Sequence, residues 1–537
     1  MRRWNGWGEE SSGMALPASA GSLLAELLGP SSPLPDAALD EVIRRVPESR
    51  LADSAHALLE TDAEIRVRHA RGQSLPDWLA MRSGEFGVFP DAVARPESGE
   101  QVRELLQLAA QLDAIVIPYG GGTSVAGHIT PAPSRRPVVT LALTRMNRLL
   151  DLDEASGVAT FGAGARGPEV EAQLRARGYT LGHFPQSWEL STLGGWVASR
   201  SSGQQSLRYG RIEQLFAGGR VETPSGSLDL PTFPASAAGP DLREFVLGSE
   251  GRLGVITEVR VRVSPLPEAE SFETVFLPDW RRALDCARDL PRQRTGLSML
   301  RVANPAETFT GLRLAVDEDQ LGWLERLLRL RGIGEDKCML TLGYTGSRVS
   351  VAETRRHARR VLHRHGAVAL MAGRLGAKWA HGRFRYPYLR EALWRLGYAV
   401  DTFETALDWS RVDGYIRDVE ARVADALSAQ GERVHVFTHL SHVYRQGSSA
   451  YTSYLFRVGD GYDATLARWR AVKQVASEAI LDWGGTISHQ HGVGRDHVPY
   501  LAAEKGELGL AALDSVFRRF DPDARMNPGV LLPGEGS

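Results

Sequence analysis

A glycine-punctuated segment near the carboxyl end of the chain places three histidines within ten residues. The segment reads Ser-His-Gln-His-Gly-Val-Gly-Arg-Asp-His over residues 488–497. His489 and His491 are one residue apart, so an extended backbone would place both rings on one face. A histidine near its unperturbed pKa of about 6.5 can exchange protons at neutral pH. The pair predicts proton transfer or substrate orientation, with a metal site or a surface turn as alternatives. We predict no metal, because no set of carboxylate or cysteine ligands accompanies the pair.

A run of three glycines follows a short apolar stretch much earlier in the chain. Residues 114–118 read Ala-Ile-Val-Ile-Pro, and Gly120–Gly122 then precede Thr123 and Ser124. Glycines leave backbone N–H groups unshielded, so a pyrophosphate could bind there with the two hydroxyls as further donors. The run is not a Walker loop, because no Gly-Lys-Ser/Thr follows, and it lacks the glycine pattern and opening helix of a Rossmann fingerprint. Alone it could equally be a tight turn.

Two further loops strengthen the prediction of a dinucleotide cofactor. Residues 185–203 surround Gly194 and Gly195 with hydroxyl side chains, and residues 248–256 lead a glycine-rich turn straight into an alternating strand. The three loops in this order are a far more specific signal than any one of them. The residues that we expect to contact the cofactor are Pro118, Tyr119, Gly120, Gly121, Gly122, Thr123 and Ser124, then Gln186, Ser187, Ser191, Thr192, Gly194, Gly195, Ser199, Arg200, Ser201 and Ser202, then Glu250, Gly251, Leu253, Gly254, Val255 and Ile256.

The elements that must position these loops are helices and strands in a mixed order. Ser98 and Gln101 predict a capped helix start, and an apolar face follows over residues 102–112. Strands are predicted at residues 114–118, 138–143 and 157–161, and the alternating stretch 255–263 predicts a half-buried antiparallel strand. Residues 22–28 predict a helix in an amino-terminal packing arm. A second α+β region is predicted after residue 265, with a helix at 410–429 and strands near 339–343 and 450–458.

Composition limits the classes of function. A chain of 537 residues with 43% hydrophobic residues predicts two or three ordinary globular domains. A net charge of −2 gives no overall electrostatic field that would attract nucleic acid. Because Cys286 and Cys338 are the only cysteines in the sequence, a disulfide framework, a cysteine-ligated zinc site and an iron–sulfur cluster are implausible. The start has Glu9 and Glu10 where a signal peptide would be apolar, and no apolar stretch approaches the roughly 18 residues of a membrane span. We expect a cytoplasmic protein with at most peripheral membrane contact.

The glycine loops resemble those of a known group of flavoproteins. Pro-Tyr-Gly-Gly-Gly-Thr-Ser, Ser-Thr-Leu-Gly-Gly-Trp and Gly-Ser-Glu-Gly-Arg-Leu-Gly-Val-Ile, in this order, resemble the vanillyl-alcohol oxidase superfamily of FAD enzymes. Within it, residues 191–196, 209–213, 441–444 and 487–494 are most similar to alkyldihydroxyacetonephosphate synthases. The resemblance implies an α+β fold: a helical arm (1–84), a PCMH-type FAD-binding domain of two α+β subdomains (85–265), an α+β cap domain (266–480) and a terminal segment (481–537) that returns to the flavin. Thr123 stands where some relatives attach the flavin to a histidine, so we expect non-covalent FAD.

The same resemblance assigns roles to individual residues. The synthase loop carries three consecutive histidines, matched by His489 and His491, whereas the middle position is Gln490, an amide that takes no proton at neutral pH. Tyr451 matches the tyrosine proposed to move a proton at the carbon beside the substrate carbonyl, which a phenol can do if a neighbouring cation lowers its pKa from about 10. A core tyrosine is the alternative, with Tyr454 as a competitor.

Two arginines complete the implied site. Arg390 matches the arginine that binds the phosphate of dihydroxyacetone phosphate, although a guanidinium suits a carboxylate equally well. Arg301 matches an arginine that is important for activity near the flavin ring, with an interdomain salt bridge as the alternative. The ending Asn527-Pro528-Gly529 resembles that of hydroxy-acid-oxidising relatives, and no peroxisomal Ser-Lys-Leu follows, so a bacterial-type homologue is expected.

Two enzymatic hypotheses follow from the resemblance. The first is a redox-neutral exchange of the acyl group of acyl-dihydroxyacetone phosphate for a long-chain alcohol through an adduct at flavin N5. The second is oxidation of a small 2-hydroxy acid of the D-lactate or glycolate type, with a histidine of residues 489–491 as base and an electron acceptor. A flavin-binding sensor or subunit without activity would leave the histidines, the tyrosine and the arginines unexplained. The expected partners are a small or lipid-like substrate and a second copy in a possible homodimer, but no nucleic acid.

Overall fold

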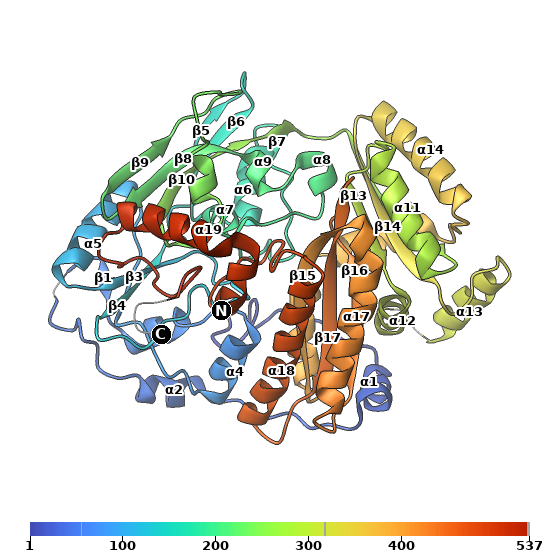
Figure 1. Cartoon of the computed structure of the whole chain (residues 1–537), viewed down its shortest axis with the longest axis horizontal. Helices are drawn as coiled ribbons and strands as arrows, with labels where there is room; N and C mark the ends of the chain where they lie inside the picture. Colours follow the sequence, from blue (N-terminus) through green and yellow to red (C-terminus); the bar gives the residue numbers. More distant parts are fainter. Residues whose placement is uncertain (55, 316–317, 534–537) are drawn as a thin grey trace.

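The computed structural model describes residues 1–54, 56–315 and 318–533. These residues form two lobes that lie side by side (Figure 1). The first lobe contains strands β1 to β11 (residues 59–265), and the second contains strands β12 to β17 (residues 269–457). Segments from both ends of the chain lie where the two lobes meet.

The first sheet of the first lobe has the order β1 (Leu59–Glu60), β2 (Ala92–Ala94), β4 (Val138–Ala142), β3 (Ile115–Tyr119). Strands β2 and β3 are both parallel to β4, so the loops that follow β3 and β4 leave the same edge. The predicted helix is α5 (Gly99–Gln111), in which the Ser98 hydroxyl accepts a hydrogen bond from the Gln101 backbone N–H at 3.3 Å. This helix buries the predicted apolar face against the sheet.

The second sheet is antiparallel and has the order β5 (Leu149–Asp153), β6 (Val158–Gly162), β10 (Val255–Arg262), β8 (Phe216–Thr223), β9 (Gly226–Leu230). Strand β10 pairs with both β6 and β8 and alternates between buried and half-buried residues towards its end, as predicted. Helices α6 (Gly167–Arg175) and α7 (Leu193–Ser199) contribute to its core. The remaining short elements are α8 (Ser206–Tyr209), α9 (Ile212–Leu215), α10 (Arg243–Val246) and the pair β7 (Tyr179–Thr180) and β11 (Ser264–Pro265).

The second lobe is one six-stranded antiparallel sheet. Its order is β12 (Ala269–Leu277), β14 (Cys338–Gly346), β13 (Met299–Ala303), β16 (Val434–Leu440), β17 (Gly447–Arg457), β15 (Tyr398–Asp408). Helices α11 (Trp280–Arg292), α14 (Arg348–Arg364), α17 (Trp409–Ser428) and α18 (Tyr462–Asp482) share one hydrophobic core with a face of this sheet. The other helices are α12 (Pro305–Ala315), α13 (Glu318–Arg329), α15 (Ala372–Gly382), the 3-10 turn Tyr386–Tyr388 and α16 (Leu389–Trp394).

The amino-terminal arm contacts both lobes. It contains α1 (Ala20–Leu28), α2 (Leu39–Arg45), α3 (Ala63–Arg68) and α4 (Leu75–Ser83). The predicted helix at residues 22–28 lies within α1, which packs on the second lobe, while α4 enters the core of that lobe. Residues 1–10 form a hairpin in which the backbones of Arg2 and Glu9 form an antiparallel β-bridge. This hairpin lies against the first lobe.

The carboxyl-terminal segment returns to the first lobe. Helix α19 (Val498–Phe520), which is kinked at Gly506, ends beside the second sheet, and Val530–Leu532 join the core there. Met526 forms a parallel bridge with Val116 of β3. No helix in the described ranges has the length and apolar character needed to span a bilayer.

Candidate functional site

The three predicted loops converge in the first lobe. A Cβ added at Gly121 would lie 1.9 Å from the Leu190 carbonyl oxygen, so the first and second loops approach as closely as glycine permits. A Cβ added at Gly251 would lie 3.1 Å from the Pro118 ring, and the Glu250 backbone N–H donates to the Ala198 carbonyl at 3.0 Å. The structure therefore brings together residues from all three parts of the predicted cofactor set.

The first loop carries unused backbone donors. Gly122 adopts φ +70°, a conformation that favours glycine, and Gly121 and Gly122 are buried. Within the described ranges, no backbone N–H from Gly120 to Ser124 donates a hydrogen bond to another residue. Buried N–H groups without a partner are rare in folded proteins. A succession of such groups in a glycine loop is an anion-binding arrangement, and the pyrophosphate of a dinucleotide fits it.

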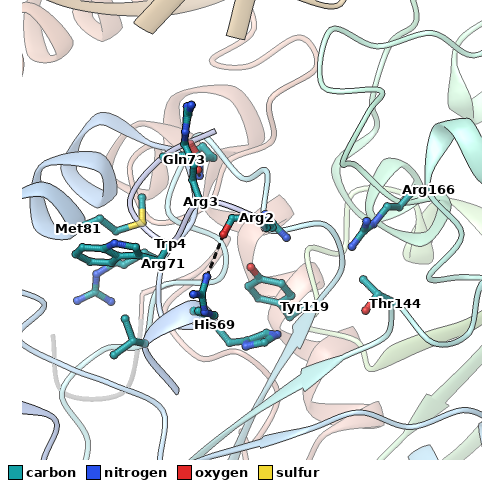
Figure 2. Close-up of a pocket in the computed structure, with 13 residues that line it drawn as sticks. Arg2, Arg3, Trp4, His69, Arg71, Gln73, Met81, Tyr119, Thr144 and Arg166 are labelled. Carbon is teal, nitrogen blue, oxygen red and sulfur yellow. Dashed lines mark hydrogen bonds between the residues drawn. The ribbon is translucent and has the colours of Figure 1, made fainter. Parts of the chain in front are cut away.

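A cavity of about 190 Å³ lies beside this loop. Figure 2 shows Tyr119, Thr144 and Arg166 on one side of it and Trp4 and Met81 on the other. The lining residues of the cavity include no carboxylate. Five arginines and one histidine are among them: Arg2, Arg3, Arg68, Arg71, Arg166 and His69. The cavity is smaller than the roughly 300–1,000 Å³ of most ligand pockets, so it fits a phosphate or a nucleoside end rather than a whole dinucleotide.

The amino-terminal hairpin forms one wall of the cavity. A guanidinium nitrogen of Arg2 donates to the Gly121 carbonyl at 2.6 Å, and Arg68 donates to the Arg2 carbonyl at 3.0 Å. Trp7 is buried against Leu190 of the second loop. Sequence reasoning considered residues 1–11 only as a possible signal peptide and missed this contact.

Several hydroxyls of the second loop already have partners within the protein. Ser191 accepts a hydrogen bond from the Trp196 indole at 2.7 Å, and the Thr192 hydroxyl caps α7 by accepting from the Gly195 N–H at 3.3 Å. Ser201 lies 3.2 Å from a ring nitrogen of His183. These side chains therefore shape the second loop and the amino end of α7 as well as facing the first loop.

The acid–base candidates lie on the face of the second sheet that α11, α14, α17 and α18 leave uncovered. Cross-strand pairing places His439 of β16 opposite Tyr451 of β17, and Tyr451 opposite Glu404 of β15. Directly paired residues point to the same face, so these three side chains form a row across the sheet. Ala303 of β13 pairs with His439, and Arg301 lies two residues earlier on the same face.

Glu404 holds the histidine segment against this row. One carboxylate oxygen accepts hydrogen bonds from the backbone N–H groups of His489 at 3.0 Å, Gln490 at 2.7 Å and His491 at 3.0 Å. The other oxygen lies 3.2 Å from Nδ1 of His489, whose Nε2 lies 2.6 Å from the Tyr444 hydroxyl. Burial alone would raise the pKa of Glu404, but the histidines and backbone donors outweigh it and lower that pKa. Burial lowers the pKa of His489 and His491, so both rings are neutral at neutral pH.

The histidine segment also reaches the third glycine loop. The Glu250 carboxylate accepts hydrogen bonds from the backbone N–H groups of Val493 at 2.6 Å and Gly494 at 2.7 Å. The Asn527 amide donates to the carbonyls of Glu250 and His128, both at 2.9 Å. The segment that carries the histidines is thus bonded to the predicted cofactor loops on one side and to Glu404 on the other.

Tyr451 lies on β17 between two histidine rings. Its hydroxyl lies 3.0 Å from the Thr402 hydroxyl, and its ring stacks on His439 with centroids 4.9 Å apart and meets His491 edge-on at 5.6 Å. A phenol can move a proton at neutral pH if a neighbouring cation lowers its pKa. Burial instead raises the pKa of Tyr451, and the charge of Arg390 opposes this only weakly. Tyr454, the competing tyrosine, points into the helix-covered core.

Arg301 pairs within its own lobe rather than across the domains. It forms an ion pair with Glu307 of α12, and its guanidinium lies 3.2 Å from Nδ1 of His439. Nδ1 of His439 also lies 3.0 Å from the Glu307 carboxylate. Burial would raise the pKa of Glu307, but Arg301 and His439 lower it to about 2. His439 and Glu307 were missed from the sequence; the only local signal is that His439 lies one residue before the end of β16, just ahead of the Ser441–Tyr444 motif.

Arg390 lies apart from the Tyr451 row. It donates to the Gln73 carbonyl at 2.6 Å and to the Asp401 carboxylate at 2.7 Å. Asp401 alternates to the opposite face of β15 from Glu404, so the guanidinium sits beside the sheet edge. A second cation, Lys473 of α18, is near this edge; burial lowers its pKa, opposed by the carboxylates of Asp496, Asp401 and Glu404. Sequence reasoning did not single out this lysine.

Metal ligation has little support in the geometry. No group of three or more histidine, cysteine and carboxylate side chains within the described ranges is arranged to hold a metal ion. The described cysteines, Cys286 and Cys338, are both buried and free.

Comparison with known families matches both lobes. A family model described as an FAD binding domain matches residues 90–229, and one described as the C-terminal domain of FAD linked oxidases matches residues 266–531. The first covers the glycine loops that follow β3 and precede α7, and the second covers the Tyr451 row and the histidine segment.

The chain is similar to individual proteins over nearly its whole length. An alkyldihydroxyacetonephosphate synthase of Dictyostelium discoideum is 30% identical over 99% of this chain and 93% of that protein. One of Trypanosoma brucei brucei is 30% identical over 94% of this chain and 85% of that protein. A solved structure of an alkyldihydroxyacetonephosphate synthase superposes with a TM-score of 0.85 at 26% identity, covering 98% of both chains. The predicted α+β fold is confirmed by this likeness.

Proposed function

The chain belongs to the alkyldihydroxyacetonephosphate synthase family of FAD-dependent enzymes, and from this premise we propose that it exchanges the acyl group of an acyl-dihydroxyacetone phosphate for a long-chain alcohol. The exchange replaces an ester-linked acyl chain by an ether-linked alkyl chain and releases a fatty acid. Net oxidation does not occur, so no electron acceptor is required.

One observation carries the proposal. The segment 488–494 is bonded to Glu404 beside Tyr451 and to Glu250 of the third glycine loop. This arrangement joins neutral proton-transfer groups of the second lobe to the cofactor loops of the first. A reaction that needs a proton moved beside a carbonyl, next to a flavin, requires that juxtaposition.

The roles of the residues follow from their surroundings. Tyr451, with its raised pKa, is a neutral phenol that can donate a hydrogen bond to a substrate oxygen. His489 is held at both ring nitrogens and orients the segment, whereas His491 lies edge-on to Tyr451 and can contact substrate. Arg301 places a buried positive charge at the row, suited to a developing negative charge on oxygen.

The substrate phosphate requires cationic partners. We assign it to Arg390, which must then share its guanidinium between the phosphate and Asp401. Lys473 is the second cation in reach of that edge of the sheet and has no ion pair within the described ranges. Both cations can contribute to holding a phosphate dianion.

FAD fits the first lobe as a non-covalent cofactor. The unused N–H groups of residues 120–124 and the arginine-lined cavity suit its phosphates, and Thr123 cannot form a histidyl bond to the ring. Bound FAD would supply the electron-pair donor and acceptor that makes the acyl–alkyl exchange possible. Peripheral membrane contact, which long-chain substrates would favour, and homodimerisation are further parts of the proposal.

Anaerobic mixing of the purified holoenzyme with palmitoyl-dihydroxyacetone phosphate tests the function. We expect the flavin absorbance to bleach and palmitate to be released without consumption of an acceptor. A parallel series with D-lactate, glycolate and other 2-hydroxy acids tests the competing oxidation. Flavin reduction by a hydroxy acid, with no response to the acyl ketone phosphate, would contradict the proposal and establish a dehydrogenase.

A further inference from the structure

The outer end of the second lobe carries a strong concentration of positive charge. Residues 348–378, which comprise α14, the turn after it and most of α15, contain seven arginines and one lysine but a single acidic residue, Glu353. Their net charge is therefore +7, although the whole chain carries −2. Figure 1 shows α14 at the end of the second lobe that lies away from the first lobe. Seven of the eight basic side chains are exposed, and we call this set the basic face.

Neighbouring elements neutralise little of the basic face. Glu273 of the edge strand β12 forms an ion pair with Arg359 at 3.4 Å, but Arg356, Arg360 and Arg374 form no ion pair with a described residue. Arg356 and Arg360 are four residues apart on α14, and like charges at this spacing destabilise a helix. Surfaces of globular proteins usually intersperse both signs of charge. A face with one sign of charge is therefore suited to an anionic partner.

The basic face surrounds the edge strand β12, and exposed apolar side chains lie at the same end of the lobe. Helix α14 joins the helix-covered core through Val351, whereas Leu375 of α15 packs with Phe276 of β12 and with α13 on the other side of the sheet. On α13, Trp323 is 55% exposed and Leu330 is 82% exposed. Arginines beside exposed tryptophan and leucine are typical of surfaces that lie in the headgroup region of a bilayer.

We propose that the basic face binds the protein to the surface of an anionic phospholipid bilayer. The choice of a bilayer rests on the proposed function, because long-chain acyl and alkyl substrates partition into membranes. Nucleic acid would account for the arginines but not for the exposed Trp323 and Leu330. The arginines contact lipid phosphates through paired N–H donors, while the two apolar side chains enter the headgroup region. Because the attraction is between exposed charges, binding is reversible and weakens with salt.

The carboxyl end of α15 leads from the basic face to the candidate site. Phe384, two residues beyond α15, stacks on Trp188 of the second loop with ring centroids 4.8 Å apart. The Arg383 guanidinium lies over the rings of Phe184 and Phe272, 5.2 Å from each centroid. Helix α15 thus connects the proposed membrane-binding surface with a loop of the predicted cofactor site. A lipid-like substrate that leaves a bound bilayer would be close to that site.

Sedimentation of the FAD-loaded holoenzyme with vesicles tests the proposal. Vesicles of phosphatidylcholine with about 30% phosphatidylserine are compared with vesicles of phosphatidylcholine alone. We expect binding to the anionic vesicles only, and its loss when NaCl is raised from about 0.1 M to about 0.5 M. The triple variant R356Q/R360Q/R374Q should bind about 10²-fold more weakly, since each basic residue near an anionic surface contributes roughly fivefold.

A second triple variant is the matched control. R44Q/R395Q/R518Q removes three exposed arginines outside the basic face and lowers the net charge by the same amount, so it should bind anionic vesicles like the wild type. Equal binding by the two triple variants would overturn the inference. Binding of the holoenzyme to duplex DNA, or a dimer that R356Q/R360Q/R374Q disrupts, with no binding to vesicles, would also overturn it. FAD content and melting temperature confirm that the compared proteins are folded and loaded.

The failure of this inference and that of the proposed function are distinguishable. Vesicle binding is measured without substrate, and palmitate release from micellar palmitoyl-dihydroxyacetone phosphate is measured without vesicles. In the micellar assay R356Q/R360Q/R374Q should release palmitate at the wild-type rate, because its substitutions lie outside the candidate site. Palmitate release without binding to anionic vesicles would overturn the inference and leave the proposed function intact. Binding to anionic vesicles without palmitate release would support the membrane-binding surface and contradict the proposed function.

Discussion

Glu404 and Gln490 are joined by a 2.7 Å hydrogen bond in which the Gln490 backbone N–H donates to the carboxylate. The bond does not involve the Gln490 side chain. The flanking N–H groups of His489 and His491 donate to the same oxygen. One carboxylate on β15 therefore fixes the backbone of the histidine segment whatever side chain occupies position 490.

Removing the Glu404 charge should loosen this segment. E404Q keeps the shape of the side chain but replaces charge-assisted hydrogen bonds by neutral ones, which costs about 1.5–3 kcal/mol. We expect the free energy of unfolding to fall by about that amount, measured by urea denaturation of the holoenzyme. E26Q, at an exposed position on α1, is the control. An E404Q protein as stable as wild type would show that the segment is held by other contacts.

Restoring a histidine at position 490 should change little. Because backbone bonds anchor the segment, Q490H should fold, bind FAD and differ in stability by about 0.5 kcal/mol or less. Because Glu404 fixes the backbone of the segment, the flanking His489 and His491 should keep their positions, and palmitate release by Q490H should lie within tenfold of wild type. The rates are compared under saturating substrate. An increase above a hundredfold would mean that the rate-limiting proton transfer requires an imidazole at this position.

Arg2 should contribute to cofactor affinity. Its guanidinium lines the cavity beside the glycine loop and donates to the Gly121 carbonyl. Loss of one charge-assisted contact is worth about 1.5–3 kcal/mol, so R2A should weaken FAD binding at least tenfold. Binding to the apoprotein is followed by quenching of FAD fluorescence. R44A, which removes an exposed arginine of α2, is the matched control. If R2A and R44A bound FAD with equal dissociation constants, the hairpin would not contribute to FAD binding.

Local sequence signals were sufficient to predict the helices, strands and loops whose structure is determined by residues within one short segment. Ser98 and Gln101 marked the start of α5 because the capping bonds join residues three and four apart. The alternation of residues 255–263 predicted β10, since a strand with one buried face shows that period directly. The glycine loops were found because their residue types restrict backbone conformation and side-chain volume.

The arrangement of the candidate site depends on contacts between segments that are distant in the sequence. His439, Tyr451 and Glu404 form a row only through the register of β16, β17 and β15, which no local pattern reveals. Glu307 reaches His439 across 132 positions of sequence for the same reason. The raised pKa of Tyr451 is a consequence of its burial by segments that are distant in the sequence, so the sequence suggested the residue but not the direction of this shift.

Gly121 should tolerate no side chain. A Cβ there would lie 1.9 Å from the Leu190 carbonyl oxygen, so G121A must separate the first and second loops. Overpacking of this kind costs about 1–3 kcal/mol, and we expect both a lower melting temperature and weaker FAD binding. Differential scanning fluorimetry of apo and holo protein measures both effects. G21A in α1, where an added Cβ meets open space, should leave both values unchanged or slightly raised.

Glu307 should contribute stability that depends on pH. Its pKa is lowered to about 2 in the folded protein, against about 4.3 in an unfolded chain. A depressed folded-state pKa means that the contribution is fully present above the unfolded pKa and is lost as pH falls towards the folded one. The loss between pH 4.5 and pH 2 amounts to roughly 3 kcal/mol, at about 1.4 kcal/mol per pKa unit. E307Q cannot titrate, so its free energy of unfolding should fall less steeply over that interval, as urea titrations at each pH would measure. Equal slopes for E307Q and wild type would show that Arg301 and His439 do not hold the carboxyl ionised in acid.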